Sequence, residues 1–240
     1  MTGLSGKTAI VTGGGTGIGR GIAMALARAG VRVLISGRRR APLEQTRITI
    51  QEAGGECLAT EADVSSAEEL QRLVQTALDA FGVLDILINN AGIGGGAQVH
   101  EHEIEDWDQV LAVNLRGPFL LSRAVLPSMR AQRSGQIVNI SSESGLEHYR
   151  GDGAYGVAKH AFNALAQYIQ RENQEHGIRV FTICPGMVVT EMTKGTPGLN
   201  EEKCLYPEDV SDFVIWLLSR RPNVKIGTPI LLQTMQNPWQ

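Results

Sequence analysis

A cluster of glycines near the N-terminus constrains the fold more than any other feature of the sequence. The apolar run 8–11 predicts a β-strand, and the segment 13–19, Gly-Gly-Gly-Thr-Gly-Ile-Gly, follows directly. A helical pattern from about Ile18 to Ala29 comes next and ends at Gly30, a typical C-terminal stop. Glycines alone are equally compatible with a flexible turn. A strand before them and a helix after them favour a turn that holds a diphosphate, because N–H groups at a helix N-terminus attract anions.

The rest of the chain alternates short apolar runs with longer helical patterns, which is typical of parallel strands joined by crossover helices. The run 86–88 is apolar throughout, as expected of a strand covered on both faces. The sequence therefore predicts one doubly wound α/β domain over residues 1–240, with about seven parallel strands and helices on both faces of the sheet. Strands are expected near residues 8–11, 31–36, 57–60, 86–88, 137–140, 179–183 and 230–232.

The helical patterns differ in clarity, and one of them contains a break. An apolar stripe with helical spacing runs from Leu70 to Phe81. Gly117-Pro118 predicts a kink inside a longer helical region, because proline interrupts helical hydrogen bonding. Trp107 and Trp216 occupy apolar helical positions, which favours burial in the core over stacking on a ligand. Helices are expected near residues 18–29, 42–54, 70–81, 104–129, 155–175 and 207–219.

The spacing of the glycines points to one family. The pattern is G-x-x-x-G-x-G preceded by Thr12, which differs from the G-x-G-x-x-G of the large dehydrogenases. The string from Thr12 to Gly19 resembles the short-chain dehydrogenase/reductase family. Further motifs of that family follow in order along nearly the whole chain, including Asn-Asn-Ala-Gly at 89–92 and Tyr-x-x-x-Lys at Tyr155 and Lys159. The resemblance implies a Rossmann-like fold that binds a nicotinamide dinucleotide.

The resemblance also implies a cofactor site that follows the ends of several strands. The family places an aspartate, here Asp63, against the adenine, and the residue matching Thr190 meets the nicotinamide carboxamide. The residues expected to bind the cofactor are Gly13, Thr16, Gly17, Ile18, Gly19, Arg38, Asp63, Val64, Asn90, Ala91, Gly92, Tyr155, Lys159, Pro185, Gly186, Val188 and Thr190.

Four residues form the predicted catalytic set: Asn114, Ser142, Tyr155 and Lys159. Tyr155 and Lys159 are four positions apart and share one face of a helix. Reduction of a ketone leaves an alkoxide that needs a proton, and a free tyrosine titrates only at about 10. An ammonium on Lys159 is expected to lower the pKa of Tyr155, and Ser142 can hydrogen-bond the carbonyl oxygen. The resemblance implies that Lys159 also holds the nicotinamide ribose, and that Asn114 holds a water of a proton relay.

The end of the second strand indicates which dinucleotide binds. An acidic residue there would bind an adenosine 2′-hydroxyl group and repel a 2′-phosphate. The sequence instead reads Ser36-Gly37-Arg38, and a guanidinium matches a phosphate in geometry and charge. The sequence therefore favours NADP(H), with NAD(H) as the alternative. Arg39 and Arg40 fit a solvated start of the next helix equally well.

Two segments are expected to frame the substrate, residues 143–154 and a lid at about 187–206. The first segment is unusually polar, and the second contains glycine and proline residues that suit a mobile loop. They favour a small polar carbonyl compound or alcohol, although the charges are equally compatible with a solvated surface. The residues expected to contact the substrate are Ser142, Ser144, His148, Tyr149 and Tyr155.

Charge and cysteine content restrict the partners and the compartment. The formal net charge is −3, which favours neither nucleic acid nor an anionic membrane as a partner. Cys57, Cys184 and Cys204 show no paired spacing, which is typical of buried thiols in a reducing compartment. We expect a cytoplasmic protein with no metal site and no membrane segment, because the histidines lack metal-binding spacing and no apolar run approaches ~20 residues.

Together these features predict an NADP(H)-dependent oxidoreductase that interconverts a carbonyl and a secondary alcohol, with Tyr155 exchanging the proton. Two alternatives are a dinucleotide-sensing regulatory protein without turnover and an NAD(H)-dependent dehydrogenase or epimerase on the same fold. Surplus apolar residues on the helices near 104–129 and 155–175 also predict a homodimer or homotetramer.

Overall fold

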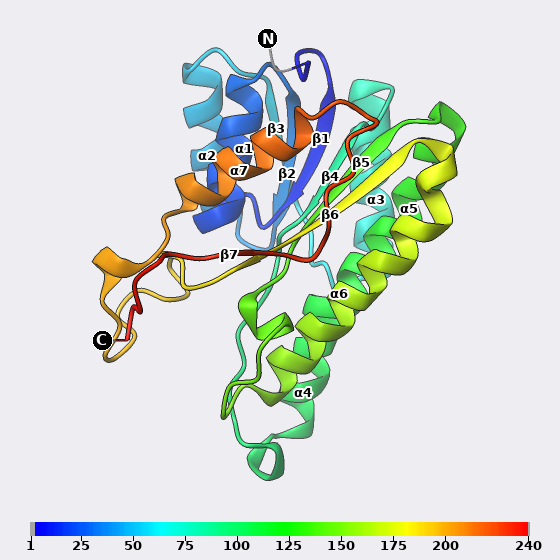
Figure 1. Ribbon diagram of the computed structural model, residues 1–240. Helices are drawn as coiled ribbons and strands as arrows, with labels where there is room; N and C mark the ends of the chain where they lie inside the picture. Colours follow the sequence, from blue (N-terminus) through cyan, green and yellow to red (C-terminus); the bar gives the residue numbers. More distant parts are fainter. Residues whose placement is uncertain (1–2, 240) are drawn as a thin grey trace.

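A computed structural model of the protein describes residues 3–239 and contains one parallel sheet of seven strands (Figure 1). The strand order is β3-β2-β1-β4-β5-β6-β7, so the chain crosses from one side of the sheet to the other after β3. The neighbouring strands β1 and β4 therefore lead into connections that diverge, and their carboxyl ends leave a crevice. The strands are β1 Thr8–Thr12, β2 Arg32–Gly37, β3 Cys57–Glu61, β4 Ile86–Asn89, β5 Gly135–Ile140, β6 Ile178–Pro185 and β7 Ile230–Leu232.

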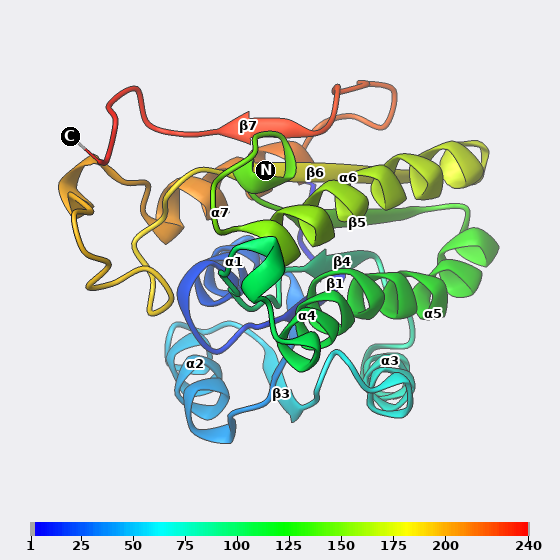
Figure 2. The same ribbon diagram turned by 90° about the horizontal axis from the view of Figure 1, so that it is seen from below.

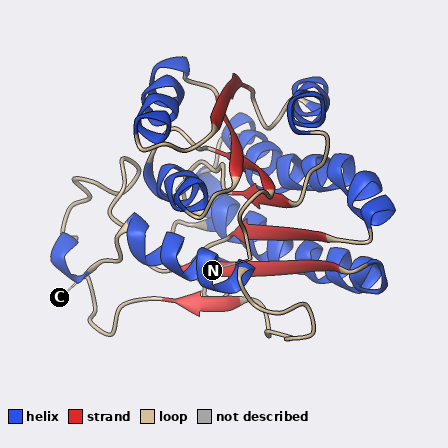
Figure 3. Cartoon of the chain, turned by 90° about the horizontal axis from the view of Figure 1, so that it is seen from above, coloured by secondary structure: helices blue, strands red, loops and turns tan. Residues whose placement is uncertain are grey.

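Helices cover both faces of this sheet, which confirms the predicted doubly wound class (Figures 2 and 3). One hydrophobic cluster joins one face of the sheet to α1, α2 and α7, and a second joins the opposite face to α3, α5 and α6. The helices are α1 Gly17–Arg28, α2 Arg40–Glu52, α3 Ala67–Phe81, α4 Ile104–Leu111, α5 Gly117–Gln132, α6 Gly153–Asn173 and α7 Pro207–Leu218.

The continuously apolar strands explain why both faces are covered. Successive side chains of a strand point to opposite faces, so Val11 packs in the first cluster and Ile10 in the second. In β4, Leu87 belongs to the second cluster and Ile88 to the first, and all four of these side chains are fully buried. Each such burial stabilises the fold by roughly 1.5–3 kcal/mol relative to an exposed side chain.

The predicted break in the long helical region exists, but it begins before the proline. Helix α4 passes into a π-helical stretch, Ala112–Arg116, and α5 starts at Gly117. Pro118 lies in the first turn of α5, directly after this stretch. A Cβ atom on Gly117 would come within 2.8 Å of the Val64 carbonyl oxygen, so glycine permits this close approach. The π-helical stretch contains Asn114.

The expectation for one of the two tryptophans is wrong. Trp216 is 46% exposed on α7, where its ring stacks on Phe213 with centroids 5.7 Å apart. The buried positions of α7 are filled by smaller aliphatic side chains, so the helix turns its tryptophan outward. Trp107 is half-buried and packs against a small cluster that includes Val110 and Ala154.

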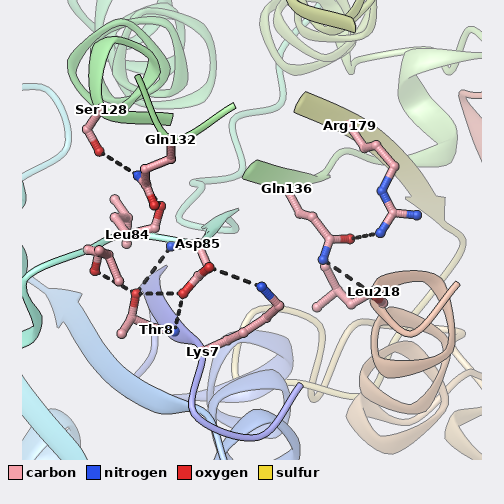
Figure 4. A network of polar contacts seen from close by, with 10 residues as sticks. Lys7, Thr8, Leu84, Asp85, Ser128, Gln132, Gln136, Arg179 and Leu218 are labelled. Carbon is pink, nitrogen blue, oxygen red and sulfur yellow. Dashed lines mark hydrogen bonds and ion pairs between the residues drawn. The ribbon is translucent and has the colours of Figure 1, made fainter. Parts of the chain in front are cut away.

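A polar network closes the sheet at the amino ends of its strands (Figure 4). The Asp85 carboxylate accepts hydrogen bonds from the Thr8 backbone N–H group and the Lys7 ammonium, both at 3.0 Å. Gln136 at the start of β5 accepts a hydrogen bond from Arg179 at 2.7 Å and donates to the Leu218 carbonyl group. These contacts tie the amino edge together and leave the opposite edge for the loops that carry the predicted site.

Candidate active site

The glycine-rich turn after β1 adopts a conformation that only glycine accommodates easily. Gly13 and Gly17 have φ angles of 66° and 52°, in the left-handed region. Gly19 lies in the first turn of α1, where a Cβ atom would be 2.2 Å from the Gly13 carbonyl oxygen and 2.4 Å from Asn90 Nδ2. The turn therefore folds tightly over the end of β1 and presents the N-terminus of α1 to the crevice.

The start of the loop after β4 is bonded to the end of β1. The Thr12 hydroxyl donates to the Ile88 carbonyl group at 3.2 Å and accepts hydrogen bonds from the N–H groups of Asn90 and Ala91. The Asn90 side chain donates to the Thr12 carbonyl group at 2.9 Å. These contacts give the Asn-Asn-Ala-Gly motif a definite role, since they fix one wall of the crevice against the glycine turn.

A cavity of about 290 Å³ opens at this edge of the sheet. It is lined by most of the residues predicted to hold the cofactor, among them the tyrosine and lysine of the predicted catalytic set. Predicted cofactor residues that line the cavity are Gly13, Thr16, Gly17, Ile18, Arg38, Asp63, Val64, Asn90, Ala91, Gly92, Tyr155, Lys159 and Thr190. Lining residues outside that predicted set include Arg39, Pro42, Leu43, Ile93, Ile140, Glu191 and Met192.

Four predicted cofactor residues do not line the cavity. Gly19 packs behind the turn, and the Gly186 N–H group donates to the Leu232 carbonyl group at 2.8 Å. Val188 is buried in the core and pairs with Leu205 in an isolated bridge, so its side chain anchors the lid segment. Pro185 is buried at the end of β6. These residues support the site from behind.

The end of the cavity near β2 carries the predicted phosphate-binding arginine. Arg38 and Arg39 both line it, and Arg39 forms a salt bridge with Glu191 of the lid segment at 2.8 Å. Burial alone would raise the pKa of Asp63, but hydrogen bonds from Ser65 and the charge of Arg38 lower it. This region therefore offers guanidinium groups to an anion and a carboxylate to a hydrogen-bond donor.

The glycine cradle and the charged groups fit a dinucleotide. A diphosphate needs close approach to backbone N–H groups, and glycines with left-handed φ angles allow it at the N-terminus of α1. A nucleoside needs an apolar wall, which Val64, Ile93 and Leu43 supply around the same cavity. A dinucleotide therefore fits this cavity, because the same cavity offers backbone N–H groups to the diphosphate and apolar side chains to the nucleoside.

Strand β5 and helix α6 bring the predicted catalytic residues together. Ser142 follows β5, and Tyr155 and Lys159 lie in the first two turns of α6. Lys159 is buried and donates a hydrogen bond from Nζ to the Ile140 carbonyl group at 3.1 Å. Its Nζ atom lies 5.4 Å from the centre of the Tyr155 ring, and the Ser142 side chain interacts with the Tyr155 hydroxyl group by hydrogen bonding.

The electrostatics of this pair differ from the expectation. Burial raises the pKa of Tyr155 to about 12, and the hydrogen bond with Ser142 only partly opposes that shift. Burial also lowers the pKa of Lys159 to about 8. The expected lowering of the tyrosine pKa was wrong, because the cost of removing a phenolate from water exceeds the stabilisation that the hydrogen bond with Ser142 gives it.

The fourth member of the set supports the loop that borders the cavity. The Asn114 side chain is buried and bonds both backbone groups of Ile93, accepting from its N–H group at 2.9 Å and donating to its carbonyl at 2.8 Å. A Cβ atom on Gly92 would lie 3.1 Å from Asn114 Oδ1. The Asn114 amide thus holds the loop after β4, and its expected part in a proton relay stays a prediction.

The predicted substrate residues lie at different depths. Ser144 is buried, and its N–H group donates to Ser142 Oγ at 3.1 Å. The His148 ring stacks on His160 with centroids 4.8 Å apart, and Tyr149 is half exposed. Ser144 therefore shapes the turn that holds Ser142, while His148 and Tyr149 lie on the exposed part of segment 143–154.

A parallel sheet with a glycine cradle at its crevice, and with a half-buried tyrosine and a buried lysine beside it, defines a Rossmann-like oxidoreductase. A family model described as short chain dehydrogenase matches residues 7–198. The chain belongs to the short-chain dehydrogenase family and is an oxidoreductase of the kind that acts on CH–OH or C=O groups. Within residues 3–239, no helix has the length and apolar character needed to cross a membrane.

Relatives cover almost the whole chain. An uncharacterized oxidoreductase of Staphylococcus aureus strain MRSA252 is 34% identical over 227 residues, which make up 95% of this chain and 97% of that protein. The structure of an alcohol dehydrogenase from the archaeon Thermococcus sibiricus, complexed with 5-hydroxy-NADP, has a TM-score of 0.88 at 31% identity and covers 97% of this chain and 98% of that one. A metagenomic short-chain oxidoreductase in complex with NADP has a TM-score of 0.85 at 32% identity, with coverage of 97% and 99%.

The Lys159 ammonium is buried, so we expect it to lower the stability of the fold although it serves the reaction. Lys159→Met removes the charge, so the variant should melt several degrees above the wild type at pH 7, since each ~1 kcal/mol shifts Tm by about 2–4 °C in a chain of this size. The difference should be complete below pH 8 and shrink towards pH 10.5, because the folded state releases the proton at about 8 and the unfolded chain at 10.5. Calorimetric melts across this pH range measure it.

The matched control is Lys225→Met, since Lys225 is exposed. This control should leave Tm nearly unchanged at every pH. A Lys159→Met variant that melts below the wild type at pH 7 would contradict the stated cost of burying the ammonium.

Proposed function

We propose that the protein is an NADP(H)-dependent oxidoreductase that interconverts a carbonyl group and a secondary alcohol. The observation that carries the proposal is that Tyr155 and Lys159 line the cavity together, with the Lys159 Nζ atom 5.4 Å from the centre of the Tyr155 ring and the Ser142 side chain beside Tyr155. When bound, the dinucleotide supplies or accepts the hydride. The chain's own residues hold the dinucleotide, orient the carbonyl group and move the proton.

In the direction of reduction, Tyr155 acts as the acid. Its raised pKa keeps the hydroxyl group protonated at neutral pH, so the donor is in the correct state before the carbonyl arrives. Ser142 donates a hydrogen bond to the carbonyl oxygen and stabilises the charge that develops there. The Lys159 ammonium lies 5.4 Å from the centre of the Tyr155 ring and favours the phenolate after the proton has left.

The dinucleotide-binding residues follow from the cavity and the sequence motif. The N-terminus of α1 and the turn from Gly13 to Gly19 hold the diphosphate, and Asp63 and Val64 meet the adenine. Arg38 holds the 2′-phosphate, which favours NADP(H) over NAD(H). Two solved relatives were crystallised with NADP or 5-hydroxy-NADP, which supports this preference. Lys159 binds the nicotinamide ribose, and Thr190 meets the carboxamide.

The substrate is a small organic molecule in this proposal, bound between segment 143–154 and the lid segment 187–206. Cys57, Cys184 and Cys204 are free thiols, which agrees with a reducing compartment, and we propose a cytoplasmic location. The two alternatives differ in simple measurements. A dinucleotide sensor would bind the cofactor without turnover, and an epimerase would retain its cofactor through purification.

A homodimer or larger assembly is proposed from exposed apolar side chains on two neighbouring helices. Val157 and Tyr168 of α6 are 50% and 67% exposed, and Phe119 of α5 is 44% exposed. The two helices run side by side on one flank of the sheet (Figures 1 and 2). Pairing with a second copy across a two-fold axis would bury this surface. Phe162 lies on the inner face of α6 and is 2% exposed, so it takes no part.

The role of Tyr155 is tested by Tyr155→Phe. This variant removes the proton donor and little volume, so kcat for ketone reduction should fall by about a hundredfold or more. The Kd for the dinucleotide, measured by fluorescence titration, should stay nearly unchanged. Tyr168→Phe on the exposed side of the same helix is the control and should keep full activity. Wild-type turnover by Tyr155→Phe would refute the role.

The cofactor preference is tested at Arg38. Arg38→Asp places a negative charge beside a 2′-phosphate, so the Kd for NADPH should rise at least about tenfold while the Kd for NADH stays equal or falls. Arg40→Asp is the control, since Arg40 is exposed and does not line the cavity. Equal losses of affinity for both dinucleotides would rule out the assignment.

The assembly is tested by light scattering at low micromolar concentration. The wild type should show at least twice the chain mass of 25.9 kDa. Val157→Glu introduces a charge into the proposed interface and should give a folded monomer. Phe162→Glu should unfold the protein, because that ring is buried within the chain. A wild-type mass near that of one chain would disprove the proposal.

A further inference from the structure

Three polar side chains follow one another on α6 at intervals of four positions. Tyr155 and Lys159 are the first two, and Asn163 is the third. Residues four positions apart are neighbours on a helix surface, so Asn163 lies one turn beyond the lysine. Asn163 is buried and has no part in the proton transfer described above. A buried amide is costly unless it is hydrogen-bonded, so the partners of Asn163 indicate what it holds in place.

The Asn163 amide joins α6 to two other elements. Its Nδ2 atom donates a hydrogen bond to the Gly145 carbonyl group at 2.9 Å. The same amide contacts the buried thiol of Cys184, with Nδ2 and Oδ1 at 3.7 and 3.8 Å from Sγ. Gly145 ends the short helix η3 (Glu143–Gly145), and Cys184 lies near the end of β6. One buried side chain therefore contacts η3 and β6 from α6.

Gly145 allows η3 to lie very close to α6. A Cβ atom on Gly145 would be 2.7 Å from Asn163 Nδ2 and 3.0 Å from the Lys159 carbonyl oxygen. The first distance is too short for a side chain, and the second is tight. The absence of a side chain at residue 145 therefore places η3 directly against the turn of α6 that carries Lys159.

The same short helix fixes the Ser142 hydroxyl group. The Ser144 N–H group donates to Ser142 Oγ at 3.1 Å, and the Gly145 N–H group donates to the Ser142 carbonyl group at 2.9 Å. A serine hydroxyl group has one proton to donate and two lone pairs that accept. Since the backbone occupies one lone pair, Oγ is held in place while its proton stays available to a carbonyl oxygen. A displacement of Gly145 would move Ser142 with it.

Two contacts with α6 flank Ser142 in the sequence. The Lys159 Nζ atom donates to the Ile140 carbonyl group at 3.1 Å, two positions before Ser142. Asn163 donates to the carbonyl group three positions after Ser142. Tyr155 projects from the same helix, so these two bonds together set where Ser142 lies relative to Tyr155. The amide carries no charge and takes no part in the chemistry, so it can act as support alone.

We infer that Asn163 is a positioning residue for the reaction, because its hydrogen bond to the Gly145 carbonyl group holds Ser142 where it can share a carbonyl oxygen with Tyr155. The inference rests on the proposed function, since it concerns the same active site. Two groups that meet one oxygen must be placed together, and a displacement of ~1 Å can lower a rate by about a hundredfold. Asn163 does not line the cavity, so it acts through Ser142.

Asn163→Ala removes the amide, and a panel of ketones measures the result. Reduction of cyclohexanone, 2,3-butanedione and 4-nitroacetophenone is followed with NADPH and with NADH. For each ketone that the wild type reduces, kcat should fall at least about tenfold, because Ser142 is no longer held in place. The Kd for NADPH, measured by fluorescence titration, should stay nearly unchanged. Asn163→Ser is a milder second variant, since its shorter side chain keeps a hydroxyl group, and its kcat should fall less.

A double-mutant cycle with Ser142→Ala separates positioning from general damage. Without the Ser142 hydroxyl group there is nothing left for η3 to position. Adding Asn163→Ala to Ser142→Ala should therefore lower kcat by less than about twofold, although the same change lowers kcat strongly in the wild type. A purely structural defect would instead lower kcat by the same factor in both backgrounds.

Asn173 supplies a matched control at the other end of the same helix. It is also buried, and its Nδ2 atom donates to the Ile169 carbonyl group at 2.7 Å. Asn173→Ala and Asn163→Ala each lose one buried hydrogen bond, so both should lower Tm in calorimetric melts. Only Asn163→Ala should lower kcat, because Asn173 has no contact with η3.

A measurement without substrate tests the contact itself. Hydrogen exchange of the Ser144 and Gly145 N–H groups, followed by NMR, should be at least about tenfold faster in Asn163→Ala than in the wild type, because the bonds of η3 open more often. In Asn173→Ala the same two N–H groups should exchange at nearly the wild-type rate.

The outcomes separate this inference from the proposed function. Wild-type kcat in Asn163→Ala, equal losses of kcat in both backgrounds of the cycle, or unchanged exchange at Ser144 and Gly145 would each overturn the inference and leave the oxidoreductase function standing. If Asn163→Ala does not fold, the same criteria apply to Asn163→Ser. Failure of the wild type with the three ketones and with a wider panel of ketones and alcohols, with either dinucleotide, would overturn the proposed function and the inference with it.

Discussion

The contact between the glycine turn and the start of the loop after β4 is the constraint on which the site depends. Gly19 leaves no room for a side chain between the Gly13 carbonyl oxygen and the Asn90 amide, so the first turn of α1 lies directly over the end of β1. The Thr12 hydroxyl fixes the neighbouring loop from below. Both walls of the cavity are therefore tied to the sheet, and the N–H groups at the N-terminus of α1 are oriented before an anion binds.

Burial disfavours the charged forms of the ionisable side chains in the catalytic set. Lys159 is buried with one backbone carbonyl as its hydrogen-bond acceptor, and Tyr155 is kept neutral by the same burial. Such an arrangement lowers the stability of the fold, and reacting groups are a common reason for it. Neutral Tyr155 suits proton donation, whereas proton abstraction from an alcohol needs further positive charge nearby.

The sequence was sufficient for most of the fold because its strands are continuously apolar and its glycine turn has a distinctive spacing. Contacts between residues that are far apart in the chain could not be predicted from the sequence. Arg39 and Glu191 are 152 positions apart, and no local pattern indicates that they form a salt bridge. The direction of the Tyr155 pKa was missed because it depends on burial by the whole surrounding structure. Trp216 has the spacing of a core residue, yet α7 places it at the surface.

The polar network around Asp85 joins the amino ends of the strands, at the edge opposite to the cavity. Together with the two hydrophobic clusters, one of which includes Val188 and Leu205 of the lid segment, it fixes the sheet from the side opposite to the cavity. Substitutions of exposed residues in segment 143–154 and in the lid segment, such as Glu147 and Met192, can therefore accumulate in descendants of this chain without eroding the framework that holds Tyr155. A scaffold divided in this way can acquire new substrates over evolutionary time by exchanging a few loop residues.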